Sequence, residues 1–531
     1  MELRKGTCSS LEAGAWPVQP FGATLALLSM VPIVFCQTGL SLDVPIDFVD
    51  VGDYSYKVPM IRPTTFFQYL ADADRINVLW GEHDASILAE FWRRYREVEP
   101  DNTVFAAFQD HDLEIVADRT IPVYCHGDEG RGKRRKPVMV WNTHGAIGRG
   151  TRPFLARHGS LPTMRKRKMG VNLLGHSMGN RYLNFVLPKR LYGDDSECFF
   201  RMVQEMGREY NLLQTRGFQY RGQTWWVVVL GCLGDLVFFS KVASLTRSFT
   251  RGPKKVGQVQ QGVCFLCNAG CPNVPFEDCN TNAAWTNTMG DPPWNEEPSL
   301  LQLVHHVPNL QASFFKLDVW HCLHLGLGRN FVSSVVAEIL HRFPGSNVEA
   351  RFAALDADIQ SFVRGRGTRL HFGHVNKDVM GYESWAKVPQ GAWQKAADTT
   401  LLLLYLQHWF EEHLSWVASC PILKQAYCAC ANINLCFDVC YKAGLWMSRL
   451  ESTTAARGGR RFLVSYQYLA YLTLGTGRDR FTVTPKFHYL DHIFRELERQ
   501  GMTLDWSLNI LSTSVQADEE SWLLFGNFIE S

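Results

Sequence analysis

The stretch that decides the fold is Thr224-Trp-Trp-Val-Val-Val-Leu230, which leads into Gly231-Cys-Leu-Gly-Asp235. An unbroken run of β-branched and aromatic residues is typical of a strand that is buried on both faces in the centre of a sheet. Two further runs, Thr120-Ile-Pro-Val-Tyr124 before His126-Gly-Asp128 and Pro137–Trp141, also predict strands. Long helical patterns separate and follow these runs. The sequence therefore predicts an α/β fold.

Composition changes along the 531 residues and divides the chain into six regions. Gly, Pro, Asn and Cys accumulate around residues 250–300, and Gly458–Arg461 is typical of a basic linker. The predicted regions are a lead-in over 1–60, a helical N-terminal region over 61–118, a first core part over 119–249, a Cys-containing insert over 250–300, a mostly helical insert over 301–457 and a second core part over 458–531.

The segment Gly130–Gly193 contains fifteen Lys or Arg residues and no Asp or Glu, although the whole chain has a net charge of only +2. At the average acid content, about six acids are expected in such a window. A one-sided positive potential suits the phosphate backbone of DNA. The alternative is a solvated face that pairs with acids from elsewhere in the chain. The candidate DNA-binding residues are Lys133, Arg134, Arg135, Lys136, Arg165, Lys166, Arg167 and Lys168.

Fifteen cysteines in a long chain do not resemble a short secreted disulfide framework, so a reducing compartment is expected. An apolar segment over residues 21–36 favours a different location, because it resembles a signal peptide or a membrane anchor. Pro20 and Pro32 interrupt that region, and its apolar core is shorter than the ~20 residues that a membrane span needs. Membrane anchoring is therefore the less favoured alternative.

Asp128 and Asp235 each follow a predicted strand. Two carboxylates on adjacent strands, with a third acid from a helix, can bind two Mg²⁺ or Mn²⁺ ions for phosphodiester chemistry. The alternative is that each Asp caps the turn that follows it.

Cys264-Phe-Leu-Cys267 has the spacing of a zinc-binding pair. Spacing does not fix the remaining ligands, which could come from Cys271, Cys279, His321 or His324. We predict His321 and His324, in Asp318-Val-Trp-His321-Cys-Leu-His324. The alternative is that the two cysteines are free and that the histidines belong to a core helix.

The order of these elements, with Pro485-Lys-Phe-His-Tyr-Leu-Asp-His492 after them, resembles DDE transposases of the Plavaka and Kyakuja–Dileera–Zisupton type. The segment Pro122–Gly132 is also similar to transposon-derived proteins that are abundant in dinoflagellate genomes. The resemblance covers about residues 61–520. It implies a ribonuclease H-like core, metal-dependent DNA cleavage and strand transfer, and a nuclear location, and it leaves open a homo-oligomer.

By this resemblance Asp128 is the first catalytic acid and Asp235 the second, and Glu519, within Asp518-Glu-Glu520, is the expected third. The sequence stops at Ser531, where the family continues a helix, so the second core part is expected to be truncated. An inactive, DNA-binding remnant of a transposon is therefore one alternative function.

A second alternative function comes from Gly175-His-Ser-Met-Gly179, which matches the nucleophile elbow of α/β-hydrolases with Ser177 as nucleophile. Only four apolar residues precede the motif, and no acid followed by a histidine has convincing spacing downstream. The other interpretation of Ser177 is a turn before a helix over Arg181–Leu187. The transposase-like interpretation is preferred.

Overall fold

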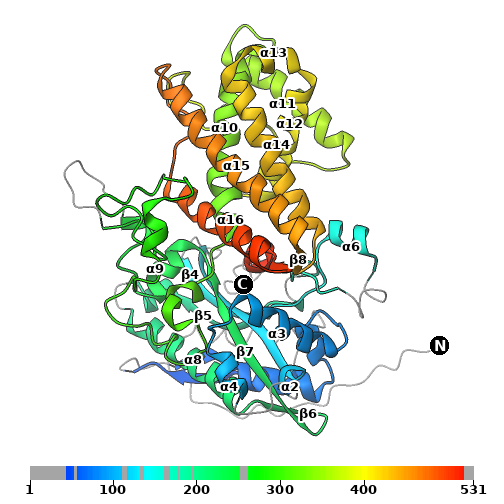
Figure 1. Ribbon diagram of the computed structural model, residues 1–531, viewed down its shortest axis with the longest axis vertical. Helices are drawn as coiled ribbons and strands as arrows, with labels where there is room; N and C mark the ends of the chain where they lie inside the picture. The colour runs from blue at the N-terminus through cyan, green and yellow to red at the C-terminus, as the bar shows by residue number, and fades with distance from the viewer. Residues whose placement is uncertain are drawn as a thin grey trace, which may run out of the picture.

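The structure is a computed structural model, and it describes residues 44–52, 57–109, 116–131, 137–160, 168–176, 179–193, 196–251 and 261–518. Figure 1 shows a sheet with surrounding helices in the lower part and a helical part above it. One hydrophobic core runs continuously through both parts, from Val49 in the sheet to Leu463 and Leu511. The α/β prediction is confirmed.

The sheet has seven strands in the order β1-β2-β5-β4-β3-β7-β6. All neighbouring pairs are antiparallel except β3 and β7, which are parallel. The strand bounds are Asp47–Asp50 (β1), Lys57–Met60 (β2), Thr120–Arg131 (β3), Pro137–Gly145 (β4), Tyr182–Pro188 (β5), Phe218–Tyr220 (β6) and Gln223–Gly234 (β7). A separate pair consists of Trp446–Ser448 (β8) and Trp506–Leu508 (β9).

The three predicted strands are present, and each is longer than its apolar run. β3 continues beyond Tyr124 to Arg131 because β4 pairs with it over that whole length, from Val123 opposite Gly145 to Arg131 opposite Pro137. Two further strands, β1 and β2, lie within or at the end of the predicted lead-in. The alternative interpretation of Ser177 as a turn before a helix over Arg181–Leu187 is wrong in its helix, because Tyr182–Pro188 forms strand β5 and pairs with β4.

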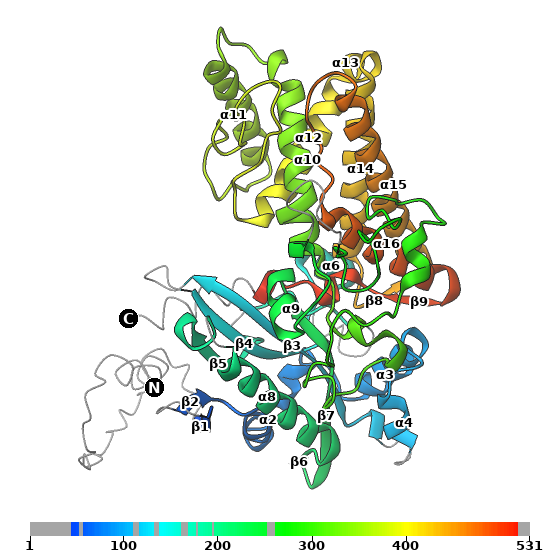
Figure 2. The ribbon, with the colours of Figure 1, turned by 90° about the vertical axis from the view of Figure 1, so that its left-hand side faces the viewer.

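Helices cover the sheet and build the upper part of the molecule (Figures 1 and 2). Tyr210 of α8 contacts the sheet, since its hydroxyl lies 2.7 Å from the Thr143 hydroxyl and accepts a bond of 3.2 Å from the Trp141 indole. The helix bounds are Pro63–Asp72 (α2), Ser86–Val98 (α3), Val104–Gln109 (α4), Arg152–His158 (α6), Glu197–Thr215 (α8), Leu236–Val242 (α9), Gly328–Ile339 (α10), Val348–Gly365 (α11), Ala396–Glu412 (α12), Leu414–Ser419 (α13), Pro421–Lys442 (α14), Arg449–Leu474 (α15) and Pro485–Thr503 (α16).

The Gly458–Arg461 segment differs from its prediction as a linker, because it lies in the middle of α15. A Cβ atom added at Gly458 would lie 2.6 Å from the Asn432 carbonyl oxygen on α14, and one added at Gly459 would lie 2.4 Å from the Phe494 ring on α16. The two glycines are therefore required for close packing of α15 against both neighbours. The predicted boundary between residues 457 and 458 falls inside this helix.

The insert contains no strand or α-helix within the described residues 261–300, and its regular structure there is the short 3-10 helix Ala284–Thr288. It lies against α16, where the Arg495 guanidinium donates hydrogen bonds to the carbonyl oxygens of Asn280 (2.5 Å) and Thr281 (3.2 Å). Figure 1 shows α16 in the middle of the molecule, where the sheet part and the helical part meet. The position of α16 determines which side chains can meet at the candidate sites.

Candidate metal centre and carboxylate sites

Four buried side chains from two distant segments form a candidate metal centre. Cys264 and Cys267 come from the irregular insert, and His488 and His492 lie one turn apart on the same face of α16. Their four ligand atoms all lie within 4.8 Å of one another. This group could hold a metal ion, and its Cys2His2 composition is that of a structural zinc site.

The distances within the centre fit tetrahedral zinc. Cys267 Sγ lies 3.2 Å from His488 Nε2 and 3.5 Å from His492 Nε2, and Cys264 Sγ lies 3.5 Å from His492 Nε2. Zn–S bonds of about 2.3 Å and Zn–N bonds of about 2.0–2.1 Å at tetrahedral angles separate sulfur and nitrogen by about 3.5 Å. The two ring nitrogens are 2.9 Å apart, a little closer than the corresponding ~3.3 Å.

The electrostatics of the centre also favour a cation. Burial disfavours the Cys267 thiolate, but hydrogen bonds from Cys264, His488 and His492 outweigh it and lower the pKa of that thiol. Burial, followed by the nearby His488, lowers the pKa of His492 to about 4, so this ring is neutral at pH 7. A thiolate and a neutral imidazole are the protonation states that bind a metal. Burial raises the pKa of Cys264, so a metal would have to displace the proton of this thiol in order to bind it.

Backbone amides orient the two sulfur atoms. The Leu266 amide donates to Cys264 Sγ at 3.3 Å, and the Ala269 amide donates to Cys267 Sγ at 3.4 Å. Trp285 covers both imidazoles, with ring centroids 4.6 Å from His488 and 4.5 Å from His492. The chain thus shields the centre from water and fixes its ligands with no more regular structure in the described part of the insert than the 3-10 helix that carries Trp285.

A second interaction holds the insert to the same helix. The buried Asp491 carboxylate forms ion pairs with Arg460 and with Arg495, the latter at 3.0 Å. Both arginines donate onward to backbone carbonyls of the insert, Arg460 to Cys279 at 2.7 Å. The centre and this ion-pair network use adjacent positions on α16, so the insert is attached at two points.

The histidines predicted as zinc ligands lie elsewhere. His321 Nδ1 is 2.8 Å from Asp318 Oδ2, and the buried His324 ring packs against Trp320 and Phe437. The cysteines meet His488 and His492 instead, because α16 folds over the insert. The signal in the sequence was an H-x3-H pair within a helical pattern, which places two imidazoles on one face.

The predicted acids Asp128 and Asp235 are brought together by the sheet. Gly127 of β3 is in register with Gly234 of β7 as the last pair of this parallel ladder. Asp235 therefore follows the end of β7, whereas Asp128 lies inside β3, opposite Val140 of β4. Asp128 is buried, and Asp235 Oδ1 accepts a hydrogen bond of 2.6 Å from the Phe238 amide at the start of α9. The capping alternative thus applies to one oxygen of Asp235.

Asp518 occupies a buried charged cluster over strands β3 and β4. Its Oδ1 atom accepts a bond of 3.0 Å from Arg181 Nε and lies 3.9 Å from His126 Nδ1 and 3.7 Å from His144 Nε2. Burial opposes ionisation of Asp518, but the charge of Arg181 outweighs it and lowers the pKa of the carboxyl. Burial, and then Arg181, lower the pKa of His144 to about 3.

Several predicted residues lie outside the described part of the chain: Glu519, Ser177, Lys133, Arg134, Arg135, Lys136, Arg165, Lys166, Arg167 and the apolar segment 21–36. Lys168 is described and exposed. Around Ser177, the chain continues into strand β5, whereas a nucleophile elbow requires a helix after the serine. Across the described residues, the helices are too short or too polar to span a bilayer.

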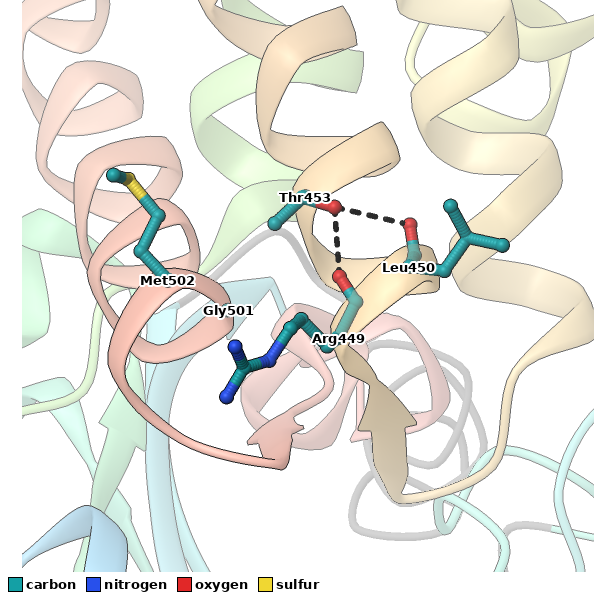
Figure 3. Close-up of a pocket in the computed structure, with 5 residues that line it drawn as sticks. All are labelled: Arg449, Leu450, Thr453, Gly501 and Met502. Carbon is teal, nitrogen blue, oxygen red and sulfur yellow. Dashed lines mark hydrogen bonds between the residues drawn. The ribbon is translucent and has the colours of Figure 1, made fainter.

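A shallow surface pocket lies between the start of α15 and the end of α16 (Figure 3). The Thr453 hydroxyl at its wall donates to the carbonyl oxygens of Arg449 and Leu450, at 2.7 and 3.3 Å, and is thus hydrogen-bonded within α15. Gly501 and Met502 complete the lining. None of the predicted site residues lines this pocket.

Comparison with known proteins adds no assignment: no family model matches the chain, and no curated protein matches it.

Proposed function

We propose that this chain is a transposase-like protein that binds DNA and cleaves a DNA strand with divalent metal ions held by Asp128 and Asp235. The observation that carries the proposal is the in-register pairing of β3 and β7, which aligns both acids at one edge of the sheet. Two metals about 4 Å apart can activate a water molecule and stabilise the leaving oxygen. Carboxylate oxygens are the ligands that Mg²⁺ and Mn²⁺ prefer.

The topology supports a ribonuclease H-like core. Antiparallel strands β3, β4 and β5 follow one another along the chain, then α8 crosses over and β7 returns parallel to β3. The first and second acids then come from the two strands at the centre of this arrangement. The described chain ends at Asp518, whose carboxylate pairs with Arg181 near His126 of β3, and the third acid of the proposal, Glu519, lies outside the described residues.

The metal centre has a separate, structural role in this proposal. Four buried ligands leave no open coordination position, and closed Cys2His2 sites stabilise folds. With zinc bound, Cys264 and Cys267 would fix the insert to α16 through His488 and His492. The acid pair is the site that would carry the reaction.

DNA binding is proposed from charge. The acid-free segment Gly130–Gly193 lies between Asp128 and Asp235 in the sequence, and its cations would contact the DNA backbone. Three of the fifteen already pair with acids elsewhere in the chain: Arg157 with Glu451, Arg181 with Asp518 and Lys189 with Glu129. Backbone contacts of this kind predict an affinity that falls steeply with salt. A duplex affinity that does not change between 50 and 200 mM salt would contradict this role.

The test is nicking of supercoiled plasmid in MnCl₂, with Asp128→Asn and Asp235→Asn as variants and Asp505→Asn, an exposed acid on the surface, as the matched control. We expect metal-dependent nicking by the unchanged protein and by the control, and none by the two site variants. Mn²⁺ binding measured by electron paramagnetic resonance should weaken in the same two variants. Equal nicking by all four proteins would refute the assignment.

A further inference from the structure

A third aspartate reaches the same sheet edge as the proposed acid pair. The segment around Phe315 runs parallel to β7, since Phe315 forms a bridge with Cys232 and the Lys316 amide donates to the Cys232 carbonyl at 2.9 Å. Three residues further along the two segments come Asp318 and Asp235. Three parallel segments therefore present Asp128, Asp235 and Asp318 at one edge.

The Asp318 carboxylate orients a histidine instead of facing outward. It is buried, and its oxygens accept from the amides of Trp320 (2.9 Å), His321 (2.8 Å) and Val515 (3.3 Å). Its Oδ2 atom also lies 2.8 Å from His321 Nδ1. An Nδ1–H that donates to a carboxylate fixes the tautomer in which Nε2 is the basic nitrogen.

The local backbone is unusual where this pair lies. Trp320–Leu327 forms a π-helix, and Gly326 within it departs from helical geometry, with φ −123° and ψ −110°. A Cβ atom at Gly326 would lie 2.6 Å from Lys486 Cδ, so the glycine leaves room for the lysine of α16 to pass. π-Helical segments are rare and are frequently found at functional sites.

Two titratable groups besides Asp318 lie near this pair: His126 on β3, within electrostatic reach of His321 and Asp318, and Lys486 on α16, within electrostatic reach of Asp318. Burial is the main cause that lowers the pKa of His126, and His321 and Asp318 act on that ring through their charges. The parallel bridge between Phe315 and Cys232 places Asp318 beside the end of β7 that leads into Asp235, and Asp318 holds His321 there.

We propose that His321, held by Asp318, is the general base of the strand-cleavage reaction at the acid pair. In this step, Nε2 takes a proton from water and the resulting hydroxide attacks phosphorus. The bond from phosphorus to the 3′ oxygen breaks, the 3′ oxygen leaves with the electron pair and takes a proton from solvent, and His321 returns its proton to solvent. This role rests on the proposed function, and it assigns to His321 a task other than zinc binding.

The test compares His321→Ala and Asp318→Asn with His374→Ala in the MnCl₂ nicking assay across pH 5.5–9. His374 is a matched control, because it forms a similar pair with Asp356 (2.7 Å) in the exposed helical part. General-base catalysis is worth roughly 10²–10⁴-fold in rate. We expect His321→Ala to reduce the nicking rate by that factor and to abolish the decrease in rate at acid pH. Added imidazole should restore the rate of this variant. Asp318→Asn should reduce the nicking rate less than His321→Ala does, and His374→Ala should leave the rate unchanged.

The outcomes separate the two proposals. An unchanged rate and pH profile in His321→Ala, with nicking still abolished by Asp128→Asn, would overturn the role of His321 and leave the proposed function standing. A loss that imidazole does not restore, with the pH profile unchanged, would show that His321 only supports the structure and would equally overturn its role. No nicking and no Mn²⁺ binding by the unchanged protein would refute both.

Discussion

Removal of the metal from the Cys264–Cys267–His488–His492 centre is expected to release the insert from α16. Two backbone amides report on this event directly, because the Leu266 and Ala269 amides donate to the two sulfur atoms. Their hydrogen exchange requires the loop around the sulfur atoms to open. Amides in the central strand β7 are held by strand pairing and do not depend on the centre.

The magnitude follows from the linkage between binding and local stability. Zinc at a thousandfold excess over its dissociation constant stabilises the bound form by about 4.1 kcal/mol. The described insert has little regular structure of its own, so its opening depends on its attachment to α16, through the centre and through the Arg460–Asp491–Arg495 network. A loss of about 4 kcal/mol corresponds to exchange that is about a thousandfold faster.

The assay is hydrogen exchange before and after chelation, together with native mass spectrometry of bound metal. We expect one zinc ion per chain in the unchanged protein and in Cys428→Ser, whose thiol is exposed on α14, and none in Cys267→Ser. The variant His324→Ala should retain the metal. Retention by Cys267→Ser, or amides of Leu266 and Ala269 whose exchange does not respond to chelation, would refute the centre.

Three other predictions concern the buried charges and the close helix packing. Arg181→Met removes the arginine that pairs with the buried Asp518 carboxylate. It should lower the free energy of unfolding in urea by about 3–5 kcal/mol. The double variant Arg181→Met/Asp518→Leu should regain most of this loss, because it also removes the buried charge. The pKa of His144 is lowered to about 3 from an unfolded value near 6.5, so the folded state binds fewer protons between these values. Stability should therefore be complete above about pH 6.5 and fall as the pH decreases toward 3, and a melting temperature whose slope between pH 4 and 7 is the same in His144→Gln would contradict this. Gly459→Ala places a Cβ atom 2.4 Å from a phenyl ring and should lower the free energy of unfolding by about 1–3 kcal/mol, whereas Gly365→Ala, with no neighbour within 4 Å, should not.

The sequence predicted the strands where local pattern and burial agree. Thr224–Leu230 is apolar without a break, and it forms the centre of β7. The continuation of β3 to Arg131 could not be predicted, since those residues are held by pairing with β4 and carry no apolar pattern. The alternative helix over Arg181–Leu187 is a short apolar segment whose pattern does not separate helix from strand. Its pairing as β5 depends on β4, about forty residues earlier.

The acid pair could be predicted from the sequence, and the metal ligands only in part. Asp128 and Asp235 each follow an apolar run that predicts a strand. In the structure Asp235 follows β7, Asp128 lies inside β3, and the parallel pairing of the two strands ends one residue before both acids. The spacing of Cys264 and Cys267 predicts a zinc-binding pair, but the two histidines that complete the site lie more than 220 residues away in the sequence. His321 was predicted as a ligand because it is closer to the cysteines in the sequence. In the structure, α16 packs against the insert and brings His488 and His492 to the two cysteines.

The structure joins the metal centre and the acid pair through one helix. His488 and His492 face the insert from α16, while Lys486 lies two residues earlier, roughly 200° away around the helix, toward Asp235. A helix transmits a displacement along its whole length, because its backbone hydrogen bonds hold its residues together. Loss of the centre would leave the first turn of α16 without its fixed partner at His488. Chelation of zinc should therefore slow Mn²⁺-dependent nicking even though the acid pair itself is unaltered, and the variants that keep zinc should keep the rate.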